Sequence, residues 1–476
     1  MINKAHAFFP ACFALRGGSF LNEQQSLTVG SVPKKILLFA IPVFFSNLFQ
    51  QLYNAADSLI VGNFLGEQAL AAVGSSGSLI MLMTGFISGM ALGAGVLIAR
   101  MFGANDKDGM ERTVHTTAAL GLCGGAVLTV VGIIFTPQIL LWMGTPSDVL
   151  AWSTLYFRVY FIGCIPVILY NMAASILQSV GDSKSPMKYL ITASVINVVL
   201  DLFFVGVLRM DVSGAALATI ISQTVSAVLA LAKLCRVDAP YRLYLRRIRF
   251  DRATLGEVVR LGVPSGVQNS VISLANVVVQ ANINAFGSAA MAGCGAYSKL
   301  EGFAFLPVSC FALALSTFIS QNIGARRYDR ARSAMRFGLI CSPLLAEVVG
   351  LAIFTFAPVL IAAFNNQPEV LSFGVNNART VSLFYFLLAF AHCCAGILRG
   401  MGRPIVPMAI MLSIWCVLRI TYITITVRLI PSIRVIYWAY PLTWAISCVL
   451  FIVCLTKLKF PPMERAGEHV SGESTT

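Results

Sequence analysis

Two acidic residues lie inside apolar stretches of the chain, where an ionisable side chain is costly and therefore usually functional. Asp57 lies near one end of a predicted membrane span over residues 36–62, and Asp201 near one end of another over residues 186–208. At about 1.5 Å of rise per residue, Asp57 is about 7.5 Å and Asp201 about 10 Å from the same membrane surface. We therefore expect the two carboxylates to lie at one depth.

Two neutral polar residues are predicted at this same depth. Thr219 lies about 9 Å from that surface in the next span, over residues 213–234, and Asn197 precedes Asp201 by one helical turn on the same face. Two carboxylates, an amide and a hydroxyl at one level could share a proton through hydrogen bonds or offer hard oxygen ligands to Na⁺. The alternative is that Asp57 and Asp201 cap helix ends near water.

Further polar residues recur at helical spacing along the first span of each half of the chain. Such stripes either line a water-filled cavity or hold neighbouring helices together by hydrogen bonds. We expect them, together with an acid in a later span, to line a substrate cavity, although that acid could instead be paired inside the protein. The residues of this predicted cavity are Gln50, Asn54, Gln268, Asn269, Asn276, Gln280 and Glu301.

The composition shows which elements must position these residues. Of 476 residues, 57% are hydrophobic and 11% are charged, whereas soluble domains have about 45–50% and about 25%. This excludes a soluble or secreted enzyme and predicts an all-α polytopic membrane protein with twelve transmembrane helices. The predicted spans are 36–62, 68–99, 114–136, 150–180, 186–208, 213–234, 258–286, 289–319, 337–357, 372–398, 405–429 and 435–455. In the second span, Gly85, Gly89 and Gly93 follow a four-residue spacing that favours close helix packing.

The two halves of the chain resemble each other at a nearly constant spacing. At a shift of 222 residues Pro42 aligns with Pro264, and after one residue drops out in a loop Gly103 aligns with Gly324 at a shift of 221. Because each half has six spans, the second half enters the membrane from the same side as the first, and the repeat is parallel. Two pseudo-symmetric six-helix bundles that can rock around a shared cavity are the architecture of a transporter.

The predicted organisation divides the chain at its most basic loop. The predicted parts are a disordered N-terminal extension (1–31), an N-terminal six-helix lobe (32–237), a basic cytoplasmic linker (238–252), a C-terminal six-helix lobe (253–460) and a disordered tail (461–476).

The positions of Lys and Arg predict the orientation of these lobes. Of 34 such residues, only Arg209, Arg428 and Arg434 lie in or next to loops on one side, four lie deep inside spans, and the rest lie in or next to loops on the other side. The positive-inside rule then places both termini in the cytoplasm of an inner (plasma) membrane protein. Because the rule also accounts for the net charge of +14, we expect no nucleic-acid partner, despite the basic stretch over 242–252.

Several segments resemble a known family. The segment IPVFFSNLFQQLYNAADSLIVGNFLGEQALAAVG, the paired loops ARMFGAND and SQNIGARRYDRARS, and LQSVGDSKSPM followed by NVVLD are similar to multidrug and toxic compound extrusion (MATE) transporters of the bacterial, DinF-like branch. The resemblance covers roughly residues 32–460. It implies two lobes in a V shape and export of organic cations, drugs or related metabolites by antiport with protons or Na⁺. It also implies that Asp57, Asn197, Asp201 and Thr219 form the cation-coupling site.

Other function classes fit the sequence less well. A flippase for lipid-linked saccharides would have a similar two-lobe architecture but a strongly cationic cavity, whereas the acids inside these spans favour cations. The stretch GSSGS over residues 74–78 fails the GxSxG pattern at its last position, and no HExxH or P-loop motif occurs. We therefore predict no enzymatic activity, no metal and no cofactor besides the coupling ion. The expected partners are a small, cationic, amphipathic substrate and the lipid bilayer, with the protein a monomer.

Overall fold

The computed structural model describes residues 26–142 and 147–457, and these residues form helices and loops without a strand. The first half contains α2 (Val32–Leu65), α3 (Glu67–Ala104), α4 (Lys107–Trp142), α5 (Ser147–Ile162), α6 (Cys164–Ser179), α7 (Lys184–Asp201), the π-helix η1 (Leu202–Val207) and α8 (Val212–Arg236). The short 3₁₀-helix η2 (Leu245–Arg247) follows. The second half contains α9 (Arg252–Asn284), α10 (Ser288–Gly324), α11 (Tyr328–Ala362), α12 (Pro368–Ser382), α13 (Tyr385–Gly400), α14 (Ile405–Met411), the π-helix η3 (Leu412–Leu418), α15 (Arg419–Leu429) and α16 (Arg434–Thr456).

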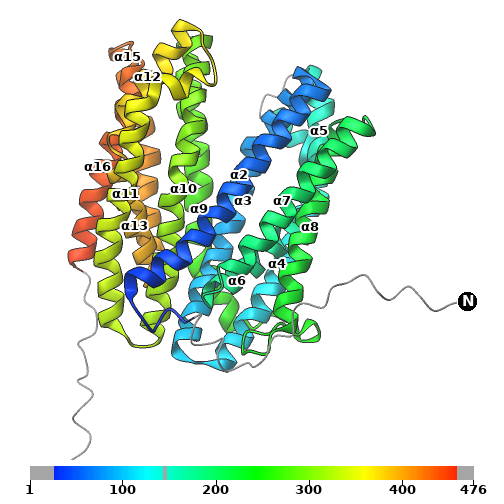
Figure 1. Ribbon diagram of the computed structural model, residues 1–476, viewed down its shortest axis with the longest axis vertical. Helices are drawn as coiled ribbons and strands as arrows, with labels where there is room; N and C mark the ends of the chain where they lie inside the picture. Colours follow the sequence, from blue (N-terminus) through cyan, green and yellow to red (C-terminus); the bar gives the residue numbers. More distant parts are fainter. Residues whose placement is uncertain (1–25, 143–146, 458–476) are drawn as a thin grey trace, which may run out of the picture.

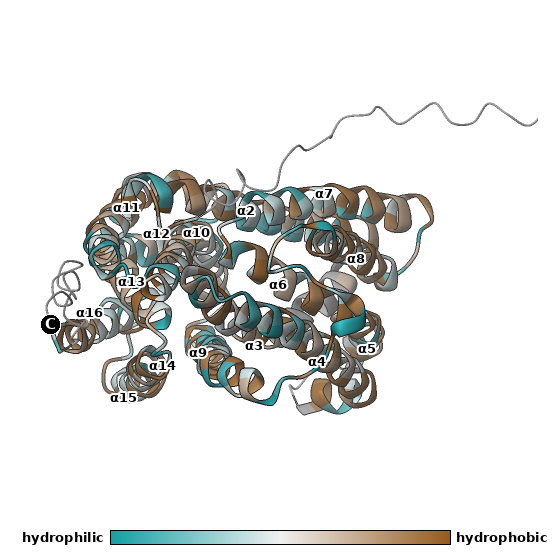
Figure 2. Ribbon diagram, turned by 90° about the horizontal axis from the view of Figure 1, so that it is seen from below, coloured by the Kyte–Doolittle hydropathy of each residue, from teal (hydrophilic) through white to brown (hydrophobic). Residues whose placement is uncertain are grey.

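These helices form two bundles that converge at the lower end of Figure 1 and diverge toward its upper end. We call the lower end the basic end, because it carries the Arg-rich loops 237–251 and 325–327. Seen from below, α3 lies beside α9, and α2 lies beside α7 and α10 (Figure 2). Contacts between the bundles therefore involve α2 and α3 of the first and α9 and α10 of the second.

The spans agree with the predicted all-α membrane fold. In the described part of the chain, nine helices are long and apolar enough to cross a membrane, and two more spans result if each of the bent pairs α5–α6 and α12–α13 is counted as one. The remaining predicted span corresponds to α9, which is 33 residues long but carries the polar stripe. The 48° bend between α5 and α6 follows Gly163, and Pro166 has no N–H to continue the helical hydrogen bonding there.

Each bundle has its own apolar core. In the first bundle the core includes Leu177 and Leu234, and in the second it includes Tyr437 and Phe451. A further apolar cluster joins α2 to α10 and α13. The bundles are therefore separately packed units that also share an apolar contact.

The helices α3 and α9 approach each other at glycine. A side chain at Gly89 would overlap the backbone of Gly266, and one at Gly93 would overlap the backbone of Gly262. The close packing predicted from the glycine spacing in α3 is confirmed, and its partner is a helix of the other bundle. Small residues at such a crossing allow two helix backbones to come into direct van der Waals contact.

The contact between α3 and α10 at the basic end is reciprocal. A side chain at Gly103 would overlap the carbonyl oxygen of Gln321, and one at Gly324 would overlap the carbonyl oxygen of Arg100. Under the shift of 221 residues, Gly103 is equivalent to Gly324 and Arg100 to Gln321. The same contact therefore occurs twice, as expected where a pseudo-twofold axis relates two surfaces.

The segment 26–31 differs from the prediction of a disordered extension over residues 1–31. The Leu27 side chain is 3% exposed, and its backbone N–H donates to Gln321 Oε1 at 3.0 Å. Arg330 donates to the backbone oxygens of Gly30 at 2.7 Å and of Leu27 at 3.2 Å. This segment therefore packs onto the second bundle, while residues 1–25 and the predicted tail 461–476 lie outside the described residues.

Candidate functional site

The two carboxylates predicted at one depth are buried on adjacent helices. Asp57 on α2 is 9% exposed and Asp201 at the end of α7 is 0% exposed, and α2 packs along α7 (Figure 2). The two acids are close enough for their charges to interact. Asp57 lies well inside α2, and the Asp201 side chain makes no capping hydrogen bond. These positions do not support the alternative of helix caps near water.

Asp201 lies where the backbone of its span changes geometry. The α-helix α7 ends at this residue and the π-helix η1 continues from Leu202. Turns of π-helix are uncommon and occur frequently at functional sites. The sequence gives no signal for η1, because its apolar residues continue the pattern of the span without a proline.

Asn197 and Thr219 connect α7 to α8 beside the acids. The Asn197 amide donates to Thr219 Oγ1 at 3.5 Å, and Thr219 Oγ1 donates to the Ala215 carbonyl at 3.2 Å. Asn197 is buried and Thr219 is partly buried. The structure therefore brings these two residues together, in the same bundle as the two acids.

Four oxygen atoms of this cluster are buried without a hydrogen-bond donor in the described part of the protein. They are Asp57 Oδ1, Asn197 Oδ1 and both carboxylate oxygens of Asp201. A buried polar atom left without a partner costs about 1–3 kcal/mol, and more when it is charged. A proton or a small cation bound among these oxygens would remove that cost.

Two tyrosines and a glutamine near the acids were missed by the sequence reasoning. Tyr53 lies one turn before Asp57 on α2, is buried, and accepts a hydrogen bond from Gln223 Nε2 at 3.1 Å. Tyr53 and the buried Tyr156 of α5 both interact electrostatically with Asp57 and Asp201. The four-residue spacing of Tyr53 and Asp57 was a signal for the first of them, whereas Tyr156 lies in a different span.

The predicted cavity residues fall into two groups, of which one is accessible. Gln50 and Asn54 on α2 and Asn276 on α9 are exposed. Gln280 is partly buried and donates to Asn284 Oδ1 on its own helix at 2.9 Å. The polar stripes of α2 and α9 therefore present accessible amides over part of their length.

The other group lies in contacts between helices. Asn269 Nδ2 donates to the Gly85 carbonyl of α3 at 3.3 Å, which is the helix-joining role left open by the sequence. Gln268 is buried with its Nε2 2.9 Å from Met411 Sδ. Gln268 Oε1 has no donor among the described residues.

Glu301 faces a positive charge in the second bundle. It is partly buried on α10, forms no hydrogen bond or ion pair within the described ranges, and interacts electrostatically with Arg419 of α15. Arg419 is 3% exposed, donates to Thr443 Oγ1 at 2.8 Å and lies 4.4 Å from the Tyr440 ring centroid. The second bundle therefore contains a mixed-charge cluster, whereas the first contains acids.

The two halves of the chain match the same protein family. A model of that family's sequences, described as MatE, matches twice, over residues 42–203 and 264–425. The two matches begin 222 residues apart, which is the shift found between the halves. The chain belongs to the MatE family.

Relatives of this MatE protein cover most of its length. It is 29% identical to the probable multidrug resistance protein YoeA of Bacillus subtilis over 90% of this chain and 94% of the relative. It is 26% identical to the probable multidrug resistance protein NorM of Thermotoga maritima over 84% and 87%. It is 25% identical to an FAD transporter of Shewanella oneidensis over 74% and 78%. These relatives are bacterial, in agreement with the predicted branch.

Solved structures share the fold of this MatE protein. A MOP superfamily transporter from Pyrococcus furiosus superposes with a TM-score of 0.85 at 23% identity, over 90% of this chain and 96% of that one. The outward-facing conformation of a multidrug resistance MATE family transporter superposes with a TM-score of 0.84 at 23% identity, over 90% and 96%. The two-lobe architecture predicted from the repeat is confirmed.

Proposed function

We propose that this MatE protein is an antiporter that exports cationic, amphipathic drugs or related metabolites by alternating access in exchange for protons or Na⁺. The observation that carries the proposal is the buried pair Asp57 and Asp201, whose oxygens lack donors in the described structure. The relatives named for multidrug resistance support the class of substrate. The transporter catalyses no chemical reaction and needs no cofactor besides the coupling ion.

The coupling site consists of Asp57, Asn197, Asp201 and Thr219. Two buried carboxylates cannot both stay ionised and unpaired at low cost, so they take up a proton or Na⁺ from the side to which the site is open. Uptake removes charge from between α2, α7 and α8 and allows these helices to pack differently. The coupling ion drives transport only because it has different affinities for the two conformations.

The charge distribution supports a plasma-membrane protein with the basic end and both termini in the cytoplasm. Because the bundles converge at the basic end (Figure 1), the described conformation is then the outward-open one. Cysteines introduced at positions 247 and 327 should react with a membrane-impermeant reagent only after the cells are opened. Labelling of either position in intact cells would show that the basic end faces the outside, which contradicts the proposed orientation.

The substrate binds between the bundles of a single monomer. The exposed amides of Gln50, Asn54 and Asn276 can accept hydrogen bonds from a substrate, and Glu301 can attract its positive charge. A flippase for lipid-linked saccharides is less well supported, because it would have to move a phosphate-bearing ligand past the carboxylates of the first bundle.

The test is efflux of a fluorescent organic cation such as ethidium from proteoliposomes under separately imposed pH and Na⁺ gradients. Gradient-driven efflux should stop in Asp57→Asn and in Asp201→Asn, and the double variant should add little because the two residues act as a unit. Glu369→Gln, a change at an exposed acid of α12, is the matched control and should transport normally.

Near-normal coupled transport by Asp57→Asn or by Asp201→Asn would show that the substituted residue is not part of the coupling site. Transport of a flavin in place of ethidium would contradict the proposed class of substrate, and transport without any gradient would contradict antiport.

A further inference from the structure

The linker between the bundles is held against the start of α4. In the structure this linker, predicted as residues 238–252, spans residues 237–251 between α8 and α9. Its Tyr244 backbone N–H donates to His115 Nε2 at 3.0 Å, and its Asp251 backbone N–H donates to Thr116 Oγ1 at 3.2 Å. His115 is buried and therefore fixes the linker from inside the bundle.

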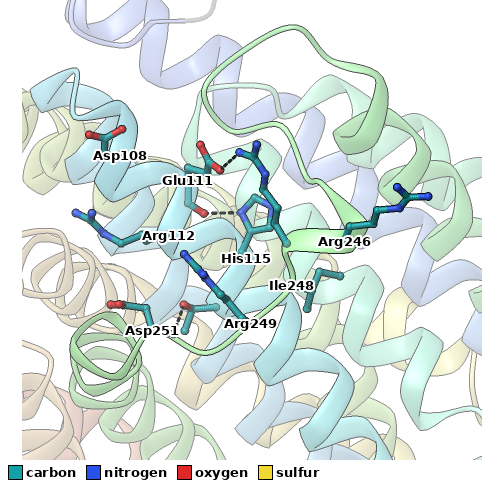
Figure 3. Close-up of a pocket in the computed structure, with 10 residues that line it drawn as sticks. Asp108, Glu111, Arg112, His115, Arg246, Ile248, Arg249 and Asp251 are labelled. Atoms are coloured by element: carbon teal, nitrogen blue, oxygen red, sulfur yellow. Dashed lines mark hydrogen bonds and ion pairs between the residues drawn. The ribbon is translucent and has the colours of Figure 1, made fainter.

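A pocket of about 440 Å³ lies between the linker and α4. Figure 3 shows Arg249 reaching from the linker into the space between Arg112 and His115. The residues that line it are Asp108, Glu111, Arg112, His115, Thr116, Arg246, Arg247, Ile248, Arg249 and Asp251. Four arginines therefore surround one small volume at the basic end.

Two of the three acids around this pocket are already engaged. Glu111 Oε1 accepts from Arg247 Nη1 at 2.8 Å. Asp251 caps α9, and the hydrogen bonds that it accepts from the Thr254 hydroxyl at 2.6 Å and backbone N–H at 2.9 Å hold the pKa of its carboxyl below the usual range.

Three arginines of the pocket form no ion pair in the described part of the protein. Arg112, Arg246 and Arg249 form no hydrogen bond or ion pair with any residue that the structure describes. The positive charges of Arg112 and Arg249 also contribute to lowering the pKa of the Asp251 carboxyl, so both side chains lie on the same side of the pocket as Asp251. Guanidinium groups grouped in this way match the oxygens of a phosphate, to which they donate two parallel hydrogen bonds each.

The linker also presents apolar side chains next to the arginines. Leu245 is 66% exposed and Phe250 is 46% exposed, and both alternate with Arg246, Arg247 and Arg249. Basic residues interleaved with exposed apolar ones are typical of a segment that lies at a membrane surface. The linker is at the end of the helices where that surface must be.

We propose that the pocket between the linker and α4 binds the phosphate group of an anionic phospholipid headgroup. Arg112 and Arg249 contact the phosphate oxygens, while Leu245 and Phe250 enter the boundary of the acyl chains. Because the linker joins α8 to α9, the bound lipid fixes the connection between the bundles at the cytoplasmic surface. The site is separate from Asp57 and Asp201 and does not depend on the proposed transport function.

The test is native mass spectrometry of the purified full-length protein titrated with phosphatidylglycerol or phosphatidylcholine. The wild type should bind phosphatidylglycerol more tightly, and Arg112→Gln/Arg249→Gln should weaken this binding about 25-fold, because each arginine near an anionic lipid contributes about fivefold. The matched control is Arg260→Gln/Arg336→Gln, which removes two exposed arginines from α9 and α11. It should bind as the wild type does.

Inorganic phosphate, added as a competitor, distinguishes the two ligands that could supply a phosphate group to this pocket, a lipid headgroup and free phosphate. It should not displace phosphatidylglycerol, because it lacks the acyl chains that Leu245 and Phe250 contact. Efficient displacement would assign the site to free phosphate and overturn the lipid proposal. Equal lipid affinity of the wild type and the double variant would overturn the site itself. If the double variant does not fold, Arg112→Gln and Arg249→Gln tested singly should each weaken binding about fivefold.

Discussion

Gln321 of α10 donates a hydrogen bond from its Nε2 to the backbone oxygen of Ser179, at the end of α6 in the other bundle, at 2.6 Å. The same side chain accepts the backbone N–H of Leu27 through its Oε1 and is fully buried. One amide therefore joins the second bundle, the first bundle and the segment before α2. Any conformation that separates the bundles at the basic end must break the hydrogen bond between Gln321 and Ser179.

Gln321→Leu should favour opening of the basic end. It removes the buried hydrogen bond to Ser179, which has a net value of about 1 kcal/mol, and shifts the equilibrium between conformations by about that amount. Spin labels at positions 184 and 403, which are exposed on different bundles, should show a larger population of long distances. Gln367→Leu, at an exposed position before α12, should leave the distribution unchanged, and an unchanged distribution in Gln321→Leu would show that this amide does not lock the end.

Gly89→Leu should destabilise the whole protein, because the new side chain overlaps the backbone of α9. Overpacking of this kind costs about 1–3 kcal/mol or more. The midpoint of thermal unfolding in detergent should fall clearly, and the protein should aggregate earlier. Gly124→Leu on α4 is the matched control, since no atom lies within contact distance of the added carbon. Equal midpoints for the two variants would contradict the close crossing of α3 and α9.

His115→Phe should release the linker from α4. The change leaves the Tyr244 N–H without its acceptor, which costs about 1–3 kcal/mol, so trypsin should cut the linker about tenfold faster or more. Glu111→Gln breaks only the ion pair with Arg247. The side chains of this pair are 64% (Arg247) and 38% (Glu111) exposed, and ion pairs that are accessible to water contribute little to stability. A larger effect of Glu111→Gln than of His115→Phe would reverse this ranking of the linker contacts.

The affinity for a cationic substrate should depend on pH through the two buried acids. Protons taken up by Asp57 and Asp201 favour the conformation that releases the substrate, so affinity measured in detergent should weaken as the pH falls. In Asp57→Asn the dependence should be flat, while Glu369→Gln should behave as the wild type does. The same slope in the wild type and Asp57→Asn would rule out exchange at this pair, even if transport itself were observed.

That Asp57, Asp201 and Thr219 belong to one region of the first bundle could be predicted from the sequence, because a helix has a fixed rise. Counting residues from the ends of three spans placed Asp57, Asp201 and Thr219 at one level, and the structure places the two acids on adjacent helices with Thr219 on the next. The change to a π-helix after Asp201 could not be predicted, since the same apolar residues fit either geometry. Tyr156 was missed for a related reason: nothing in its own span indicates the neighbouring helix.

Contacts between the bundles were the least predictable part of the fold. The glycines of α3 indicated a close crossing but not that its partner is α9. Segment 26–31 has no periodic pattern, so its order depends entirely on residues such as Gln321 and Arg330 that lie far away in the sequence. Those tertiary contacts, and not local propensity, decide the conformation of such a segment.

Leu27 and its partner Gln321 are 294 residues apart, and this separation has a consequence for biosynthesis. A ribosome releases the segment before α2 early, whereas α10 emerges only after the first bundle and the linker have been made. During that interval the segment has no partner on the second bundle. The contact between segment 26–31 and α10 is therefore among the last to form. A newly inserted first bundle must remain stable without this contact.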